Sequence, residues 1–192
     1  MALGNALNNI LSFIGYKTIH VDIINDRGIH ICKSMLAYKK FGKNKEPNKK
    51  ADHFVGDYYV LYSKEVEKNP DLEQECYNML QAWEFGDKEV HTLWKKMNNW
   101  ALKGFQETYK RYGTIIDKAY FESDHYKKGK ELIEEGIKQN VFTKDEKGNI
   151  IADLSQEGLG KKVVLRADGT TIYITQDLIL AKIRYTDYIM DK

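Results

Sequence analysis

The hydrophobic pattern of the first 40 residues changes from a helical period to an alternating one and back again, and few folds accommodate that order. Apolar residues between Leu3 and Ile14 recur every three or four positions, and a glycine follows as a helix-ending residue. Lys17–Ile24 alternates and is rich in β-branched residues, which is typical of a strand. Turn residues at Asn25–Gly28 then lead into a second helical pattern. Helix, strand, turn and helix predict part of a βαβ unit whose first strand would precede Met1, and therefore an α/β fold.

The middle of the chain predicts a block of helices. It follows a stretch rich in lysine and asparagine at residues 42–51, which we expect to be a solvated loop. Pro70 suits the first residue of one helix, and Asp87 suits the N-cap of the longest one. Apolar and aromatic residues along that longest helix keep three- and four-residue spacing for about six turns. We interpret its aromatic stripe as core and not as a platform for stacking bases.

The last third of the chain predicts short strands with one helix between them. A strand is expected at Thr114–Phe121, and a charged helix around Tyr126–Ile137. Two hairpins are then expected, one turning near Lys147–Asn149 and one at Asp168–Gly169. The second prediction rests on Asp-Gly, because both central positions of a type I′ turn need positive φ. The segment Thr170–Asp177 would then run from a strand into a helix.

Composition sets only broad bounds. With 192 residues, 42% of them hydrophobic, the chain is long enough to bury roughly 70% of its unfolded surface as one domain. Thirty basic and 28 acidic residues give a net charge of +2, so charge alone makes no case for nucleic acid. Cys32 and Cys76 match no metal spacing; a reducing compartment is the simple interpretation, and one disulfide stays open. We expect the N-terminal segment to be neither a signal peptide nor a membrane span, because it carries no basic leader and asparagines interrupt its apolar run.

Tyr173 and Asp177 are the strongest candidates for a ligand site. They place a phenol and a carboxylate at the expected strand-to-helix junction, and ligands of open α/β sheets bind at the carboxyl ends of strands. A carboxylate beside a phenol suits a planar cation such as guanidinium, whose fork of donors matches acceptor oxygens. Arginine is a small ligand of that kind. The plain alternative is a strand tyrosine followed by an acid that favours a helix start.

Several segments, in order along the chain, closely resemble the catalytic domain of bacterial arginyl-tRNA synthetases, which are class I aminoacyl-tRNA synthetases. The clearest are ADGTTIYITQDLILAKIRY at residues 167–185 and LGNALNNILSFIGYKTIHVDIINDRGIHICKSMLAY at residues 3–38. Residues 52–65, 86–113 and 152–169 resemble the family as well. The resemblance implies an α/β fold, part of a Rossmann-like catalytic domain with helical and β-hairpin insertions and helix-rich overall.

The resemblance also implies a division of the chain, which we expect to be a single catalytic-domain fragment over residues 1–192. The expected segments are a Rossmann-like core segment (1–42), a helical insertion (43–87), a core helix and strand (88–122), an insertion with a hairpin (123–166) and a core segment with the arginine site (167–192).

The activity that the resemblance implies is arginine-tRNA ligation. Arginine reacts with ATP, a substrate that comes with Mg²⁺, to give arginyl-adenylate, and the arginyl group is then transferred to tRNA(Arg). In the family Tyr173 and Asp177 would contact the guanidinium, so lysine and citrulline should be poor ligands. No tightly bound cofactor, no membrane and no DNA partner is expected, and the location would be cytoplasmic.

Two signatures of the family do not occur in this sequence, namely a HIGH-like string and a KMSKS-type loop, and its 192 residues do not include the helical anticodon-binding domain of the family. We therefore expect a piece of a synthetase that contains no catalytic residue of its own and does not charge tRNA alone. The alternatives are a free-standing, non-catalytic module that binds arginine or tRNA, and a purely structural role for the helical block.

A second group of residues matches the family's active-site wall. Asn25–Gly28 corresponds to a motif beside the adenylate and the tRNA end, often Gly-Asp-Trp-Gly in the family, so Asn25 and Arg27 depart from the pattern. The plain alternative is a tight turn in which Gly28 supplies an unusual backbone angle. The residues expected to line the wall are Asn25, Asp26, Gly28, His30 and Gln176. We do not interpret His30 as catalytic, because class I activation needs no histidine.

Two further features have a structural interpretation. Glu122 and Ser123 match a recurrent pair of the family, but we interpret Ser123 as a helix N-cap. The lysine cluster of Lys43, Lys45, Lys49 and Lys50 could touch tRNA phosphates, but we expect an exposed, solvated loop.

Overall fold

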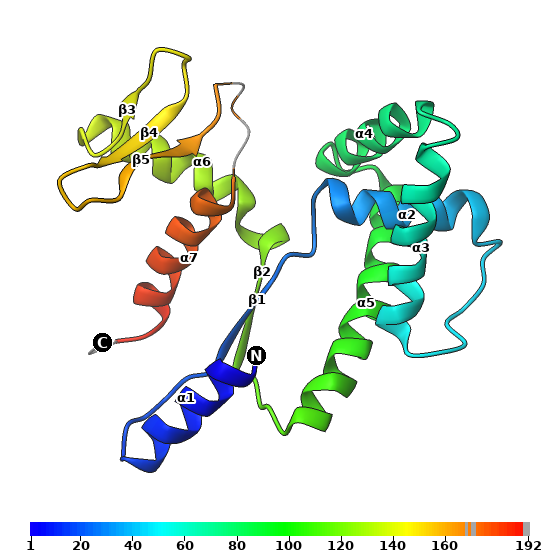
Figure 1. Ribbon diagram of the computed structural model, residues 1–192, viewed down its shortest axis with the longest axis horizontal. Coiled ribbons are helices and arrows are strands. Elements are labelled where there is room, and N and C mark those ends of the chain that lie inside the picture. Colours follow the sequence, from blue (N-terminus) through cyan, green and yellow to red (C-terminus); the bar gives the residue numbers. More distant parts are fainter. Residues whose placement is uncertain (168, 170–171, 190–192) are drawn as a thin grey trace. The chain divides into compact units, whose positions relative to one another are not determined.

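The computed structural model describes residues 1–167, 169 and 172–189, and the chain divides into two compact units, Met1–Ala119 and Tyr120–Lys192. The elements run in the order α1 (Ala2–Phe13), β1 (Val21–Ile24), α2 (Ile29–Phe41), α3 (Ala51–Val66), α4 (Asp71–Glu84), α5 (Lys88–Tyr112), β2 (Lys118–Phe121), α6 (Glu122–Lys138), β3 (Thr143–Lys144), β4 (Ile150–Leu154), β5 (Gly160–Leu165) and α7 (Tyr173–Asp187) (Figure 1). β1 pairs with β2, and β3, β4 and β5 form a second sheet in that order.

The first unit is built on a bundle of α2, α3, α4 and α5, in which α2 lies across α3 (Figure 1). Helices α2, α3 and α5 meet at a cluster of four aromatic rings, Tyr38, Phe54, Tyr58 and Trp100, which pack edge to face with centroids 5.2–6.4 Å apart. Edge-to-face pairs add about 0.5–1.5 kcal/mol each beyond the area that they bury. Met97 of α5 is 2% exposed, so this helix buries its apolar stripe as expected, although Phe105 is 39% exposed.

Local chemistry sets the ends of the longest helix. The Asp87 carboxylate accepts a hydrogen bond from the amide of Val90 at 2.9 Å, so the predicted N-cap is confirmed. Gly113 ends α5 in the left-handed conformation, with φ 66°. Pro70 lies one position earlier than predicted, because it is the N-cap of α4 and Asp71 is its first residue.

Gly104 of α5 lies in tight contact with Asp52 of α3. It is buried, and a Cβ at this position would lie 2.6 Å from the Cβ of Asp52. We expect Gly104→Ala to lower the free energy of unfolding by about 1–3 kcal/mol, because the two helices must separate to relieve the overlap. Urea denaturation of the 192-residue chain measures the change.

Gly56 of α3 supplies the matched control for that substitution. It is exposed within a helix, and a Cβ there would meet nothing within 4 Å. Gly56→Ala should therefore raise stability by up to about 1 kcal/mol, since alanine is the better helix former. Equal effects of the two substitutions would show that helix propensity, and not the close approach, decides the result.

The two predicted strands of the first half are shorter than the pattern suggested. Lys17–Ile24 contributes only β1 (Val21–Ile24), and Thr114–Phe121 contributes only β2 (Lys118–Phe121). Each strand is limited to the residues that find a pairing partner, because an isolated extended segment gains no ladder bonds. Ahead of the strands, the carbonyl of His20 accepts the amide of Asp117 at 2.8 Å, and the Asp117 carboxylate accepts the amide of His20 at 2.7 Å.

α1 is helical as predicted but buries none of its residues within the described part of the chain. Its apolar side chains Leu3, Leu7 and Phe13 are 74%, 51% and 91% exposed. Gly15 follows with φ 96°, as expected for a helix-ending glycine.

The second unit packs α6 and α7 against each other and against β5 of an antiparallel sheet (Figure 1). The predicted turn near Lys147–Asn149 is confirmed: it joins β3 to β4, Gly148 has φ 86°, and the Asp145 carboxylate accepts the amides of Lys147 and Asn149. A hairpin that joins β4 to β5 was not predicted.

Two sequence predictions about this unit are wrong, and a third falls outside the described residues. Ser123 is not an N-cap, because α6 starts earlier, with Phe121 as N-cap and Glu122 as first residue. The turn expected at Asp168–Gly169 falls on Asp168, which lies outside the described residues. Tyr173 is not a strand residue, since α7 begins there.

Within the described ranges, no helix is long and apolar enough to cross a membrane.

Candidate ligand sites on two turns

Tyr173 and Asp177 lie on the same face of α7, in its first two turns. Tyr173 is the first residue of the helix and Asp177 follows four positions later, a spacing that puts two Cβ atoms about 5–6 Å apart. Both side chains are exposed, and that of Tyr173 is 72% exposed. A phenol oxygen and a carboxylate can therefore reach one ligand together, as the spacing of the two residues predicts.

Thr175, between them, holds this turn in place from the opposite face. It is 0% exposed, its hydroxyl donates to the carbonyl of Val164 in β5 at 2.5 Å, and it accepts the amide of Ile172 at 3.1 Å. On its other side lies Gly129 of α6, where a Cβ would meet the Cγ2 of Thr175 at 3.0 Å. The sequence alone does not single out Thr175. The one feature that could have identified it is its position: a polar residue on the buried side of the first turn of α7.

The role of this hydroxyl can be tested with an isosteric change. Thr175→Val keeps the volume but leaves the Val164 carbonyl and the Ile172 amide without this partner, so we expect a loss of about 1–3 kcal/mol in the free energy of unfolding. Thr175→Ser keeps the hydroxyl and should lose less. Denaturation followed by far-ultraviolet circular dichroism measures both. A valine variant as stable as the wild type would show that the two hydrogen bonds contribute nothing net.

Gln176 faces the interior. It is 8% exposed, and its side-chain nitrogen finds no hydrogen-bond partner among the described residues. Its predicted place in an active-site wall stays a prediction.

The turn Asn25–Gly28 belongs to the first unit and is tightly held. Asp26 is 6% exposed, and its backbone carbonyl accepts hydrogen bonds from Trp94 at 2.6 Å and from Asn98 at 2.9 Å, both on α5. Gly28 has φ 109° and its carbonyl accepts the amide of Cys32 at 3.2 Å, which begins α2. The unusual glycine angle predicted for this turn is therefore confirmed.

The other residues predicted to line the wall near this turn differ in exposure. Asn25 and His30 are exposed, and a ring nitrogen of His30 lies 3.2 Å from the hydroxyl of Tyr59. Arg27, which is not among the residues predicted to line the wall, is 9% exposed at its side chain and forms an ion pair with Glu84 at 2.6 Å. Asn25 and His30 are therefore accessible to solvent, whereas the Arg27 side chain is held by the protein.

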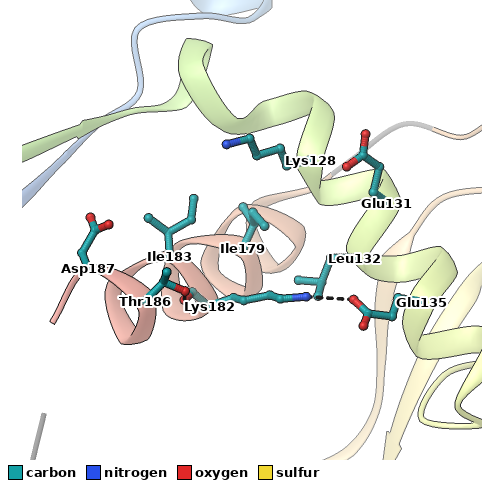
Figure 2. Close-up of a pocket in the computed structure, with 9 residues that line it drawn as sticks. All are labelled: Lys128, Glu131, Leu132, Glu135, Ile179, Lys182, Ile183, Thr186 and Asp187. Carbon is teal, nitrogen blue, oxygen red and sulfur yellow. Dashed lines mark hydrogen bonds and ion pairs between the residues drawn. The ribbon is translucent and has the colours of Figure 1, made fainter. Parts of the chain in front are cut away.

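A pocket of about 410 Å³ lies between α6 and α7 (Figure 2). Ile179 and Ile183 rise from α7 toward α6, and an ion pair of Lys182 with Glu135 at 2.8 Å crosses its rim (Figure 2). The hydrogen bond from Lys182 also lowers the pKa of Glu135. Neither Tyr173 nor Asp177 lines this pocket, so it is separate from the candidate ligand site on α7.

Two of the four lysines in the cluster Lys43, Lys45, Lys49 and Lys50 form ion pairs with acidic side chains of α3. Lys49 pairs with Asp57, and Lys50 pairs with Asp52, which favours the solvated interpretation over a phosphate contact. Contact with tRNA therefore stays a prediction for this loop.

Both cysteines are free and buried, with Cys32 2% and Cys76 1% exposed. Burial raises the pKa of Cys32 to about 12, so its thiolate is scarce at neutral pH and the thiol is inert. In the described part of the chain no three His, Cys, Asp or Glu side chains gather where they could hold a metal ion.

Comparison with known proteins identifies the family to which this chain belongs. The whole chain, residues 1–192, matches the profile of "tRNA synthetases class I (R), catalytic domain". It is 48% identical over 210 aligned residues to the "Arginine--tRNA ligase" of Bacteroides fragilis, covering 99% of this chain and 35% of the relative. The relative of the same name from Treponema denticola is 51% identical over 192 residues, covering 97% of this chain and 32% of the relative.

One solved structure extends the similarity to the fold. The crystal structure of arginyl-tRNA synthetase from Plasmodium falciparum matches with a TM-score of 0.68 at 14% identity, over 95% of this chain and 30% of that one. The chain thus spans about a third of the length of the curated relatives that it matches.

Proposed function

Because this chain belongs to the family of class I arginyl-tRNA synthetase catalytic domains, we propose that the protein containing it is an arginine-tRNA ligase. In the first step the carboxylate of arginine attacks the α-phosphorus of ATP, which forms arginyl-adenylate and releases pyrophosphate. In the second step a ribose hydroxyl of the terminal adenosine of tRNA(Arg) attacks the activated carbonyl, and AMP leaves.

The observation that carries the proposal is the pairing of Tyr173 with Asp177 on one exposed helix face. The Asp177 carboxylate would accept two N–H groups of the guanidinium, and the Tyr173 hydroxyl would accept another. The hydrogen bonds of Thr175 to Val164 and Ile172 hold the first turn of α7, which supports a fixed backbone position for both acceptors before arginine would bind. Such preorganisation contributes to affinity because little conformational freedom is lost on binding.

This arrangement also accounts for selectivity among arginine-like ligands. Lysine offers a compact ammonium that cannot match two acceptors in one plane, and citrulline is neutral. Either ligand would leave an acceptor unsatisfied, and a site from which the bound ligand excludes water can reject such analogues by roughly 10⁴–10⁵.

The remaining chemistry is positioning and charge stabilisation around ATP. The turn Asn25–Gly28 would border the adenylate and the tRNA end. Mg²⁺ would arrive as the counter-ion of the ATP phosphates and offset their charge; no residue of this chain is assigned to the phosphates or to the metal.

Arginine-dependent ATP–pyrophosphate exchange by the full product of the gene that encodes these residues tests the proposal. We expect exchange with arginine and at least a thousandfold less with lysine or citrulline. Exchange that depends equally on another amino acid would refute the assignment. Binding of arginine without any exchange would instead favour a non-catalytic arginine-binding module, which calorimetry on the 192-residue chain would detect. Exchange by the 192-residue chain alone would contradict our expectation that this chain does not act by itself.

A further inference from the structure

The Arg27 side chain, two residues before α2 begins, is held by two residues of α4. Its guanidinium pairs with Glu84 at the end of α4, with 2.6 Å between Nη2 and Oε1, and lies 5.3 Å above the centre of the Trp83 ring. A planar guanidinium can donate to a carboxylate and stack on an indole at the same time, which lysine cannot do. Arg27 is thus fixed by two neighbouring residues of one helix.

The next link joins this contact to α5. Trp83 is 5% exposed, stacks on His91 with centroids 5.1 Å apart and meets Trp94 edge-on at 5.4 Å. Trp94 in turn donates its ring N–H to the carbonyl of Asp26 at 2.6 Å. The contacts therefore form a closed ring: Arg27 to Trp83, Trp83 to Trp94, and Trp94 back to the residue before Arg27.

A closed ring of this kind restrains the backbone of the turn at two adjacent residues. Asp26 is held through its carbonyl by α5, and Arg27 is held through its side chain by α4. The following residue, Gly28, already has a backbone conformation that other residues rarely adopt. The turn consequently has little freedom to move independently of α4.

We propose that Arg27 is a positioning residue, which fixes the turn Asn25–Gly28 on α4 through Glu84 and Trp83 and thereby sets the shape of the adenylate-facing wall. The inference rests on the proposed function, since the turn borders the adenylate only in that case. In this role Arg27 acts through its contacts with Glu84 and Trp83 and not by touching substrate. It acts through the backbone of Asp26 and the exposed side chain of Asn25.

The expected signature is a fall in kcat without a change in KM for arginine. Arginine is held by Tyr173 and Asp177, so a displaced turn leaves its binding intact, whereas a misplaced reacting group slows the chemistry steeply. We expect Arg27→Gln to lower kcat for pyrophosphate exchange by about tenfold or more, with KM for arginine within twofold of the wild type.

The experiment measures kcat and KM for exchange in the full gene product, well below the melting temperature of each variant. The set comprises the wild type, Arg27→Gln, Arg27→Lys, Glu84→Gln, the double variant of Arg27→Gln with Glu84→Gln, and Arg111→Gln. Arg111 is an exposed arginine of α5 and serves as the matched control. Because Arg27 and Glu84 act as a unit, the double variant should be no slower than Arg27→Gln alone. Arg27→Lys should recover only part of kcat, since it keeps the charge but loses the stacked plane.

The outcomes separate this role from the alternatives. A lower melting temperature with unchanged kcat would make Arg27 purely structural and overturn the inference, as would a raised KM for arginine with unchanged kcat. If Arg27→Gln fails to fold, Glu84→Gln decides, because Glu84 is 46% exposed and its loss removes the same ion pair; unchanged kcat in that variant would also overturn the inference. A wild type without arginine-dependent exchange would refute the proposed function itself, whereas an active wild type with unaffected variants would refute only the role of Arg27.

Discussion

Replacing Asp177 with asparagine is expected to lower kcat/KM for arginine in pyrophosphate exchange by about 10²-fold or more. Once bound arginine excludes water from the pair, truncating one partner of such a charge pair costs about 2–5 kcal/mol, because the guanidinium is then bound without its counter-charge. Asparagine keeps the shape of the side chain but offers one acceptor oxygen in place of two. The same variant should discriminate less between arginine and citrulline, because the site no longer requires a cation.

Two further variants test whether the effect is specific to the Asp177 carboxylate. Tyr173→Phe removes one hydroxyl and should cost less, about tenfold, in line with a single hydrogen bond to a charged group. Glu134→Gln makes the same change of charge on the exposed surface of α6 and should leave exchange unchanged. Normal kcat/KM in the Asp177→Asn variant would refute the assignment of the guanidinium site to α7.

Ile133→Ala should destabilise the second unit by about 2–5 kcal/mol. The Ile133 side chain is 0% exposed in α6, so its removal leaves a cavity in addition to the lost transfer free energy. Since α6 packs against α7, the loss should loosen the helix that carries Tyr173 and Asp177. Urea denaturation followed by circular dichroism measures the effect.

Ile137, one turn further along the same helix, is the control for Ile133. It is 39% exposed, so Ile137→Ala removes the same atoms from a site that water already reaches and should cost under about 1 kcal/mol. Similar losses at both positions would mean that helix contacts outside the buried face dominate the stability of the unit.

Predictions that rested on local chemistry agree with the structure. An aspartate before a helical pattern became the N-cap of α5, because its carboxylate can reach the amide three residues later. Gly28 and Gly148 have the positive φ that their turns require. The fold class, an α/β part of a class I synthetase catalytic domain that is rich in helices, is confirmed by the family and fold similarities.

Predictions that depended on tertiary contacts agree less well. Tyr173 lies between Ile172 and Ile174, after two threonines, and such a run of β-branched residues favours a strand by propensity. Its helical conformation is supported by Thr175, whose hydroxyl bonds to Val164, a residue eleven positions earlier that no local pattern connects to it. The pairing of Tyr173 with Asp177 on one face could be predicted from their spacing, whereas the anchor behind them could not.

Arg27 illustrates the same limit at the second turn. From the sequence it was only a departure from a family motif in which tryptophan is common. Its partners Trp83 and Glu84 are more than fifty residues away in the sequence. Whether an arginine at this position finds partners therefore depends on how α4 packs against α2. The arginine at position 27 can be interpreted only once the structure shows that it contacts Trp83 and Glu84.

The division of the chain into two units has a spectroscopic consequence. All three tryptophans, Trp83, Trp94 and Trp100, lie in Met1–Ala119, and Tyr120–Lys192 contains none. Indole emission therefore reports on the first unit alone, and two of its three fluorophores belong to the ring of contacts around Arg27. A change in emission that precedes the loss of helical dichroism would reveal the turn Asn25–Gly28 loosening while the helices stay folded.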